Sequence, residues 1–178
     1  MSARLVAVVG PSGAGKDTLM ALACAARPGQ ICAARRVITR AADAGGEDFE
    51  PVTEAEFAAR QAQGDFALHW AAHGLHYGIP RAQLTGQGIV LFNASRAILA
   101  RAQAMLPALS VVVVTAPAPV LAARLAGRGR ESRDDQARRL ARADFTLPAG
   151  IHAHEVMNDT SPDEGLARFL AALQPERA

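Results

Sequence analysis

The feature that most constrains the fold is the octapeptide at residues 10–17, Gly-Pro-Ser-Gly-Ala-Gly-Lys-Asp. It matches the phosphate-binding loop pattern G-x-x-x-x-G-K-[ST] at every fixed position except the last. Glycines let the backbone curl so that several N–H groups point at one phosphate, and a following helix adds the positive end of its dipole. Lys16 is the single lysine among 19 basic residues. Its compact ammonium suits a contact with the outer phosphates that an arginine does not imitate.

The flanking residues supply the setting that this loop requires. Residues 5–9 are continuously apolar with three valines, which predicts a strand buried on both faces. Residues 18–26 are predicted to form a helix. The alternative is a glycine-rich turn with a surface lysine. We expect the polyphosphate of a nucleotide to be bound by Gly10, Pro11, Ser12, Gly13, Ala14, Gly15, Lys16, Asp17 and Thr18.

Asp17 stands where this pattern normally has the Ser or Thr that contacts magnesium. A carboxylate in the first helical turn suits the helix dipole. Beside a polyphosphate, however, it is repelled unless a cation lies between them. We therefore hypothesise that Asp17 binds Mg²⁺ directly or through water, with Thr18 as a weaker candidate. The alternative is that Asp17 only caps the helix.

Length and composition set broad limits. A chain of 178 residues, half of them hydrophobic, is expected to form one compact domain. A net charge of +2 is too small to indicate a nucleic-acid partner. Cys24 and Cys32 lack metal-ligand spacing and are expected to be reduced thiols. No apolar run suits a signal peptide or a membrane span, so we expect a cytoplasmic protein. We expect it to be a monomer or a homodimer.

Strands and helices are predicted to alternate along the chain. Further strands are expected at residues 31–39, 89–92, 109–115 and 151–157, and helices at 53–64, 95–105, from 117 onward and at 162–173. The helix at 53–64 is expected to begin with a capping box of Thr53 and Glu56. A loop is expected at residues 41–46, and a hairpin at 66–80 that Gly74 and Gly78 interrupt. This order predicts an α/β fold in which helices cover both faces of a parallel sheet.

One stretch is rich in arginine: Arg124, Arg128, Arg130, Arg133, Arg138, Arg139 and Arg142. Such a run is often a solvated surface. Arg128 and Arg130, however, flank a glycine in a predicted loop, which is where a closing lid carries its charge-stabilising residues. Arginines that donate to the transferred group accelerate phosphoryl transfer by roughly 10³ to 10⁵.

A second group of candidates lies at the predicted carboxyl end of a strand, where ligands bind in open α/β sheets. Arg36 and Arg40 are close in sequence to Glu47 and Asp48. Each arginine can grip a phosphate of an acceptor through a bidentate fork. The alternative is that they pair with the neighbouring carboxylates.

Histidines and one tyrosine are concentrated at residues 69–77. Three histidines, at 69, 73 and 76, suggest zinc, but no cysteine or carboxylate completes a ligand set. We favour a role in which Tyr77 presents its hydroxyl to a phosphate or sugar and His76 assists.

The collinear motifs of the chain resemble a known superfamily. They are residues 10–19, 37–40, 64–66, 74–80, and Arg124-Leu125 through residues 128–132 to Arg139-Leu140. In order and rough spacing they are similar to the guanylate kinase superfamily of P-loop kinases. Within this superfamily, the chain resembles the ribose 1,5-bisphosphate phosphokinases of phosphonate catabolism. Two features carry this resemblance: the Gly-Lys-Asp ending of the loop and the stretch Ile-Thr-Arg-x-x-Asp-Ala-Gly-Gly-Glu at residues 38–47.

The resemblance implies a P-loop kinase domain with a five-stranded parallel sheet, an acceptor-binding region at about residues 35–88 and an arginine-rich lid at about 124–142. It implies ATP and Mg²⁺ as cofactors and transfer to ribose 1,5-bisphosphate, which gives 5-phosphoribosyl 1-diphosphate and ADP. Lys16, Arg128 and Arg139 are then expected to stabilise the transferred group, and Asn158 to lie near the adenine. The residues expected to bind the acceptor are Arg36, Arg40, Glu47, His76 and Tyr77.

Two departures from true guanylate kinases argue against guanine as the acceptor base. The second arginine of the Thr-Arg-x-Pro-Arg motif is replaced near Asp43, and His69 stands where those enzymes carry an acidic residue that reads guanine. Losing hydrogen-bond partners for a base costs much of the selectivity for it.

Three other functions remain open on the sequence. They are a nucleoside monophosphate kinase with altered base preference, a non-catalytic binding module, and a kinase that phosphorylates a hydroxyl. The last needs a carboxylate base, for which Asp48 is the candidate.

Overall fold

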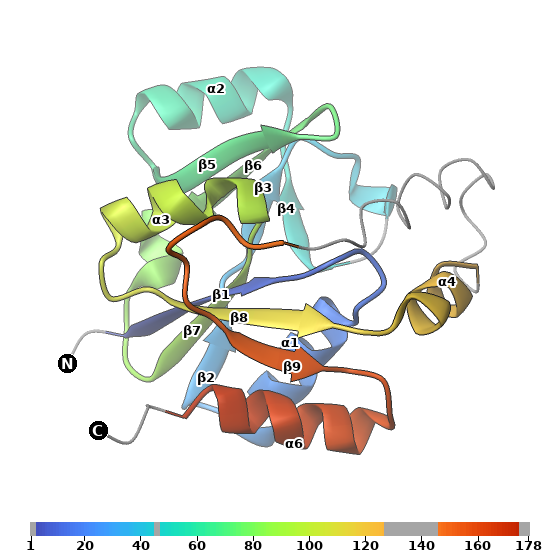
Figure 1. The fold of residues 1–178 in the computed structure, drawn as a ribbon. Helices are drawn as coiled ribbons and strands as arrows, with labels where there is room; N and C mark the ends of the chain where they lie inside the picture. Colours follow the sequence, from blue (N-terminus) through green and yellow to red (C-terminus); the bar gives the residue numbers. More distant parts are fainter. Residues whose placement is uncertain (1–2, 45–46, 127–145, 175–178) are drawn as a thin grey trace.

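The computed structural model describes residues 3–44, 47–126 and 146–174. Its centre is a parallel five-stranded sheet, as the alternating pattern predicts (Figure 1). In spatial order the strands are β2 (Ile31–Ala33), β7 (Ile89–Asn93), β1 (Arg4–Val9), β8 (Ser110–Thr115) and β9 (His154–Met157). The apolar runs of β1 and β8 lie in the middle, where both faces are covered.

Alternate residues of the central strands enter two different cores. Val6 and Val8 face the core that is closed by α1 (Lys16–Ala26), α4 (Ala118–Ala126) and α6 (Pro162–Ala172). Val9 and Phe92 face the core that is closed by α3 (Leu99–Met105) and by a second, smaller sheet. The main sheet is therefore packed on both faces, which explains why its central strands β1 and β8 contain continuous apolar runs.

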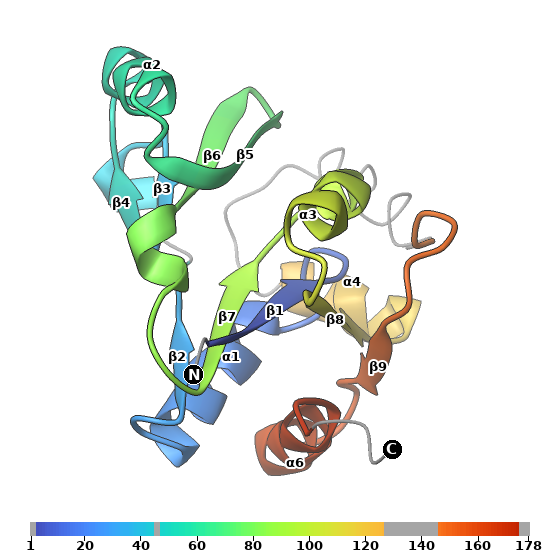
Figure 2. The same ribbon diagram turned by 90° about the vertical axis from the view of Figure 1, so that its left-hand side faces the viewer.

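The smaller sheet has four strands in the order β4 (Phe49–Pro51), β3 (Arg36–Ile38), β6 (Leu75–Pro80) and β5 (Phe66–Ala72). Its outer face is covered by α2 (Glu54–Ala62), where the rings of Phe57 and Phe66 stack with centroids 4.7 Å apart. The expected capping box of Thr53 and Glu56 begins this helix. The small sheet and α2 lie on one side of the main sheet, and α1 and α6 on the other (Figure 2).

The expected single strand at residues 31–39 is wrong, because the chain changes sheets within it. β2 belongs to the main sheet, which the backbone leaves after Ala34 donates to the carbonyl oxygen of Leu91. β3 then begins at Arg36, in the small sheet. The exposed Arg35 stands at this change of direction.

Three other local predictions need correction. α1 begins at Lys16, and not at Thr18, because Gly15 occupies the N-cap position. β4 was not predicted, since it is only three residues long and pairs in parallel with β3. Gly78 does not interrupt the hairpin but lies within β6, where a Cβ would stand 2.6 Å from the ring of Phe66.

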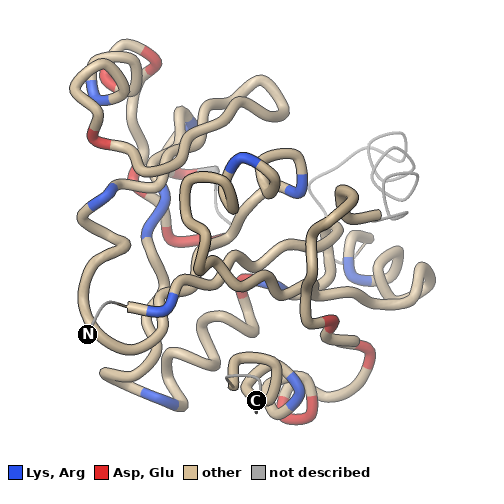
Figure 3. Tube along the Cα trace, turned by 60° about the vertical axis from the view of Figure 1, so that its left-hand side comes forward, with Lys and Arg blue, Asp and Glu red and all other residues tan. Residues whose placement is uncertain are grey.

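Basic and acidic residues are interspersed along the described chain, and several of opposite charge lie close to one another (Figure 3). This distribution agrees with the small net charge. Within the described ranges, no helix combines the length and apolar character needed to cross a bilayer.

Candidate active site

The glycine loop between β1 and α1 adopts a conformation that only glycine tolerates easily. Gly10, Gly13 and Gly15 all have positive φ, at 149°, 85° and 89°. A Cβ at Gly10 would lie 2.0 Å from the carbonyl oxygen of Val114. The glycines are thus required both by the backbone angles and by the close approach of β8 to the loop.

The side chain of Lys16 folds back over the glycine loop that precedes it. Its Nζ donates to the carbonyl oxygens of Gly10 at 2.9 Å and Pro11 at 3.1 Å. These contacts hold the ammonium beside the loop, at the edge of the cleft that the loop opens into. An anion bound there meets a positive charge that is already in position.

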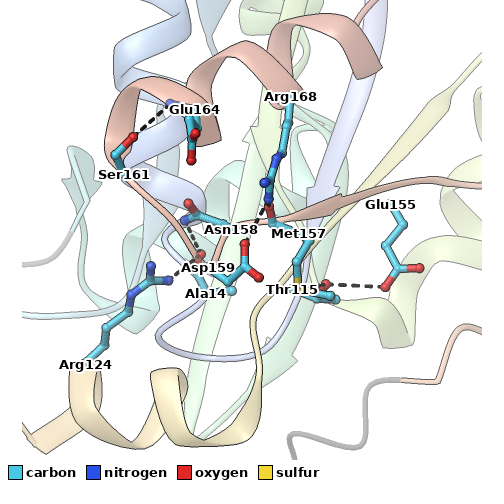
Figure 4. A network of polar contacts seen from close by, with 10 residues as sticks. All are labelled: Ala14, Thr115, Arg124, Glu155, Met157, Asn158, Asp159, Ser161, Glu164 and Arg168. Carbon is cyan, nitrogen blue, oxygen red and sulfur yellow. Dashed lines mark hydrogen bonds and ion pairs between the residues drawn. The ribbon is translucent and has the colours of Figure 1, made fainter.

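Asn158 and Arg124 hold the loop from its other side (Figure 4). The buried Asn158 donates through Nδ2 to the carbonyl oxygen of Ala14 at 2.7 Å. Arg124 Nη1 lies 3.4 Å from the carbonyl oxygens of Gly13 and Ala14. A Cβ at Gly15 would stand 2.5 Å from Asn158 Nδ2, so this contact also requires glycine. The structure places the Asn158 amide against the loop backbone, and its expected position near the adenine stays a prediction.

The loop opens into a cleft of about 540 Å³. Three parts of the chain line it. The loop and α1 contribute Gly10, Pro11, Ser12, Lys16 and Asp17. The small sheet and its connections contribute Arg36, Glu47, Trp70, Ala72, His73 and Tyr77. The segment that leaves β7 contributes residues 93–97. The cleft therefore joins the predicted donor loop to most of the predicted acceptor residues.

Asp17 faces this cleft from the first turn of α1. It does not cap the helix, because Gly15 occupies the N-cap position and no side chain caps it. The Oδ1 atom of Asp17 accepts a hydrogen bond from Asn93 Nδ2 at 2.8 Å. A carboxylate has a second oxygen, and hard oxygen donors are the ligands that Mg²⁺ takes. Thr18, the weaker candidate, is exposed and does not line the cleft.

Arg36 pairs with a carboxylate, which was one of its two predicted roles. Its guanidinium contacts both carboxylate oxygens of Glu47, with Nε 2.7 Å from Oε2. The side chains are only 10% and 15% exposed, so the pair is buried and not a surface contact. Arg36 also donates to the carbonyl oxygen of Asn93 at 3.3 Å.

Two aromatic rings pack beside this ion pair. Tyr77 and Trp70 stack with centroids 5.4 Å apart, and the Arg36 guanidinium carbon lies 5.0 Å from the centroid of Tyr77. Burial raises the pKa of Tyr77, although the positive charges of Arg36 and Arg40 oppose the shift. The phenol is therefore neutral at physiological pH and is able to donate a hydrogen bond into the cleft.

Arg40 and His76 do not line the cleft with the other predicted acceptor residues. The guanidinium of Arg40 lies 4.2 Å from the ring centroid of Phe49, and Arg40 lines a separate, shallower pocket of about 360 Å³. His76 packs its ring 5.4 Å from that of Phe57. Since successive strand residues point to opposite faces, His76 and Tyr77 cannot both face the cleft.

The histidines form no metal site within the described residues, where no group of three His, Cys, Asp or Glu is placed to hold an ion. Burial lowers the pKa of His69, and the positive charges of Arg101 and His76 act in the same direction. Asp48, the candidate base, is exposed and pairs with Arg35 at 3.0 Å. It does not line the cleft.

Sequence reasoning missed Asn93, Ser95 and Arg96, which line the cleft at the end of β7 and directly after it. The rule that ligands bind at the carboxyl ends of parallel strands would have singled them out. Arg128 and Arg139 lie outside the described residues.

Comparison with known proteins gives the family. A family model described as "AAA domain" matches residues 5–147. The ribose 1,5-bisphosphate phosphokinase PhnN of Ruegeria sp. (strain TM1040) is 51% identical, over 98% of this chain and 93% of that protein. The chain belongs to the ribose 1,5-bisphosphate phosphokinase family.

A second member of this phosphokinase family is part of a longer protein. The bifunctional ribose 1,5-bisphosphokinase-thymidine phosphorylase of Cupriavidus necator is 48% identical over 94% of this chain, but only 28% of that protein is covered.

The phosphokinase family shares its fold with guanylate kinases. The guanylate kinase of Anaplasma phagocytophilum superposes with a TM-score of 0.65, over 98% of this chain and 90% of that one, at 17% identity. This likeness confirms the P-loop kinase fold predicted from the motifs. The protein is a kinase because it belongs to the phosphokinase family.

Proposed function

We propose that the protein transfers the γ-phosphoryl group of ATP to ribose 1,5-bisphosphate. The products are 5-phosphoribosyl 1-diphosphate and ADP. The observation that carries the proposal is that one cleft joins the glycine loop and Lys16 to the Arg36–Glu47 pair and Tyr77. The names of relatives that are about half identical supply the substrate class.

The reaction is a displacement between two anions. An oxygen of the acceptor's 1-phosphate attacks the γ-phosphorus, and the bond between that phosphorus and the bridging oxygen of ADP breaks. ADP leaves with the electron pair. The second pKa of a phosphate group is near 6, so the attacking oxygen is already ionised at neutral pH and needs no general base. Positioning and charge neutralisation are what the protein must supply.

Lys16 and the loop amides bind the donor phosphates in this proposal. The ammonium of Lys16, which the carbonyl oxygens of Gly10 and Pro11 hold beside the loop, donates to the polyphosphate. Asp17 would hold magnesium, directly or through water, because its carboxylate lines the cleft next to Lys16. When bound, magnesium neutralises charge on the transferred group.

On the acceptor side, the Tyr77 hydroxyl donates a hydrogen bond to the substrate. Arg36 and Glu47 form the wall of the cleft beside Tyr77. Arg40 and His76 stay predictions from the sequence for this side, since neither lines the cleft. Arg128 and Arg139 complete the charge stabilisation from the lid, a role proposed from the sequence alone.

We place the reaction in the cytoplasm. Cys24 and Cys32 are free thiols, which suits a reducing compartment.

The competing functions receive less support from the geometry. A kinase for a hydroxyl would need a base in the cleft, and Asp48 is 83% exposed and outside it. A guanylate kinase would need an acidic residue that recognises guanine, and His69 occupies the corresponding position in this sequence.

One assay separates these functions. The protein is supplied with ATP and Mg²⁺ together with ribose 1,5-bisphosphate, GMP or gluconate in parallel, and ADP release is followed. We expect ADP release that depends on ribose 1,5-bisphosphate. Release with GMP alone, or with gluconate alone, would overturn the proposal.

A further inference from the structure

Asp17 and Asn93 meet although 76 positions separate them in the sequence. Asn93 is the last residue of β7, which pairs with β1 so that Asn93 lies beside Val8. Asp17 lies in the first turn of the helix that follows β1. The sheet register therefore brings the end of β7 to the glycine loop, and Asn93 Nδ2 lies 2.8 Å from Asp17 Oδ1.

The chemistry of the two groups fixes the direction of this hydrogen bond. An ionised carboxylate only accepts, so the NH₂ group of Asn93 has to face Asp17. Both residues line the cleft. With Oδ1 engaged by the amide, the rotation of the Asp17 carboxylate is restricted, and the direction of its second oxygen is defined.

In P-loop NTPases generally, magnesium is held by a Ser or Thr hydroxyl at the end of the loop and by an Asp on a neighbouring strand. Here the two chemical roles are exchanged. The carboxylate stands at the end of the loop, as Asp17, and a neutral side chain stands at the end of the adjacent strand β7, as Asn93. The pair still contains one carboxylate, but this carboxylate stands at the end of the loop and not at the end of the strand.

We infer that Asn93 is a positioning residue that orients the Asp17 carboxylate toward the metal of the bound nucleotide. Asp17 and Asn93 thus form an exchanged pair, with the carboxylate at the end of the loop and a neutral side chain at the end of the strand. This inference rests on the proposed metal role of Asp17. A consequence is that restoring the usual order, with a hydroxyl at 17 and a carboxylate at 93, preserves metal binding, whereas changing position 17 alone does not.

The test measures binding of Mn²⁺ to the ADP-bound protein by electron paramagnetic resonance, which requires no turnover. Four proteins are compared: the wild type, Asp17→Ser, Asn93→Asp and the double variant Asp17→Ser/Asn93→Asp. We expect Asp17→Ser to weaken Mn²⁺ affinity about tenfold or more, and the double variant to return within about threefold of the wild type. Asn93→Ala, which removes only the orienting donor, should weaken affinity by about tenfold, the size that partners of metal ligands typically show.

Asn93→Asp alone places two carboxylates at hydrogen-bond distance, where they repel unless a cation lies between them. Its melting temperature should therefore fall in EDTA and recover with Mg²⁺ and ADP more than that of the wild type. Asp48→Ser is the matched control, since it removes an exposed carboxylate outside the cleft. It should leave Mn²⁺ affinity unchanged.

The outcomes separate the two claims. If Asp17→Ser binds Mn²⁺ as the wild type does, the proposed metal role of Asp17 fails. If Asp17→Ser is impaired and the double variant is impaired at least as much, the exchanged pair is wrong. Unchanged affinity in Asn93→Ala would also overturn the positioning role.

Discussion

The side-chain amide of Asn158 donates to the carbonyl oxygen of Ala14 over 2.7 Å, although 144 positions separate the two residues. This hydrogen bond joins the end of β9 to the glycine loop. Asn158 is itself fixed, because its backbone N–H donates to the carbonyl oxygen of Thr115 at 2.8 Å. The conformation of the loop is thus set by the main sheet and not only by its own glycines.

Asn158→Ala should therefore weaken both the fold and nucleotide binding. The Ala14 carbonyl loses its buried partner, which costs about 1 to 3 kcal/mol of unfolding free energy. Urea denaturation and the affinity for ADP measure the two effects. Asp159→Asn is the control, because Asp159 forms a partly exposed ion pair with Arg168 and should cost less than about 1 kcal/mol. Normal ADP affinity in Asn158→Ala would show that the loop does not depend on this contact.

Lys16→Met should strongly lower the rate of transfer without unfolding the protein. Removing one group that stabilises developing charge typically lowers kcat by about 10² to 10³. Lys16 is only partly buried and contacts carbonyl oxygens of its own loop, so the melting temperature should change little. Lys16→Arg should not restore the rate, because the guanidinium is too large for the loop. Wild-type kcat in either variant would contradict the assignment.

The Arg36–Glu47 pair should behave as one unit. Because both side chains are nearly buried, Arg36→Met leaves an uncompensated carboxylate and should cost about 3 to 5 kcal/mol. Adding Glu47→Leu removes that charge, so the double variant should be more stable than Arg36→Met alone. Urea denaturation of the wild type, the two single variants and the double variant gives the coupling energy between Arg36 and Glu47. The exposed Arg35–Asp48 pair is the comparison and should couple by less than about 1 kcal/mol. Equal coupling in the two pairs would show that the cleft wall is not buried as described.

Tyr77 should make stability fall at high pH. Burial raises the pKa of Tyr77 in the folded state, so the unfolded chain loses its phenol proton first, near pH 10. The stabilising contribution is complete below that value and is lost as pH rises toward the folded pKa. The difference in unfolding free energy between wild type and Tyr77→Phe should therefore shift in favour of the variant above pH 10. A difference that stays constant from pH 8 to 11 would rule out a buried phenol.

Local sequence patterns predicted the donor half of the site. The apolar strand, the three glycines and Lys16 are contiguous, so each supports the interpretation of the next. The capping box at Thr53 was found for the same reason, since a helix start depends on neighbouring residues.

Contacts between distant segments could not be predicted in this way. For Arg36 the sequence left a phosphate and a carboxylate as equal partners, and the choice depends on where β3 and its neighbours place Glu47. Asn93 carries no motif of its own, and its meeting with Asp17 follows from the register of β7 against β1. Asn158 was matched to a family position, but packing against Gly165 and the loop decides where its amide points.

The central claim is transfer of a phosphoryl group to the 1-phosphate of ribose 1,5-bisphosphate, and ³¹P NMR of the reaction tests it most directly. We predict that the single resonance of the 1-phosphate is replaced by two coupled diphosphate resonances as ADP forms, while the 5-phosphate resonance remains. Lys16→Met should leave the spectrum of the substrates unchanged. If the wild type converts ATP to ADP and inorganic phosphate with the 1-phosphate resonance intact, or builds the diphosphate at the 5-position, the account is contradicted.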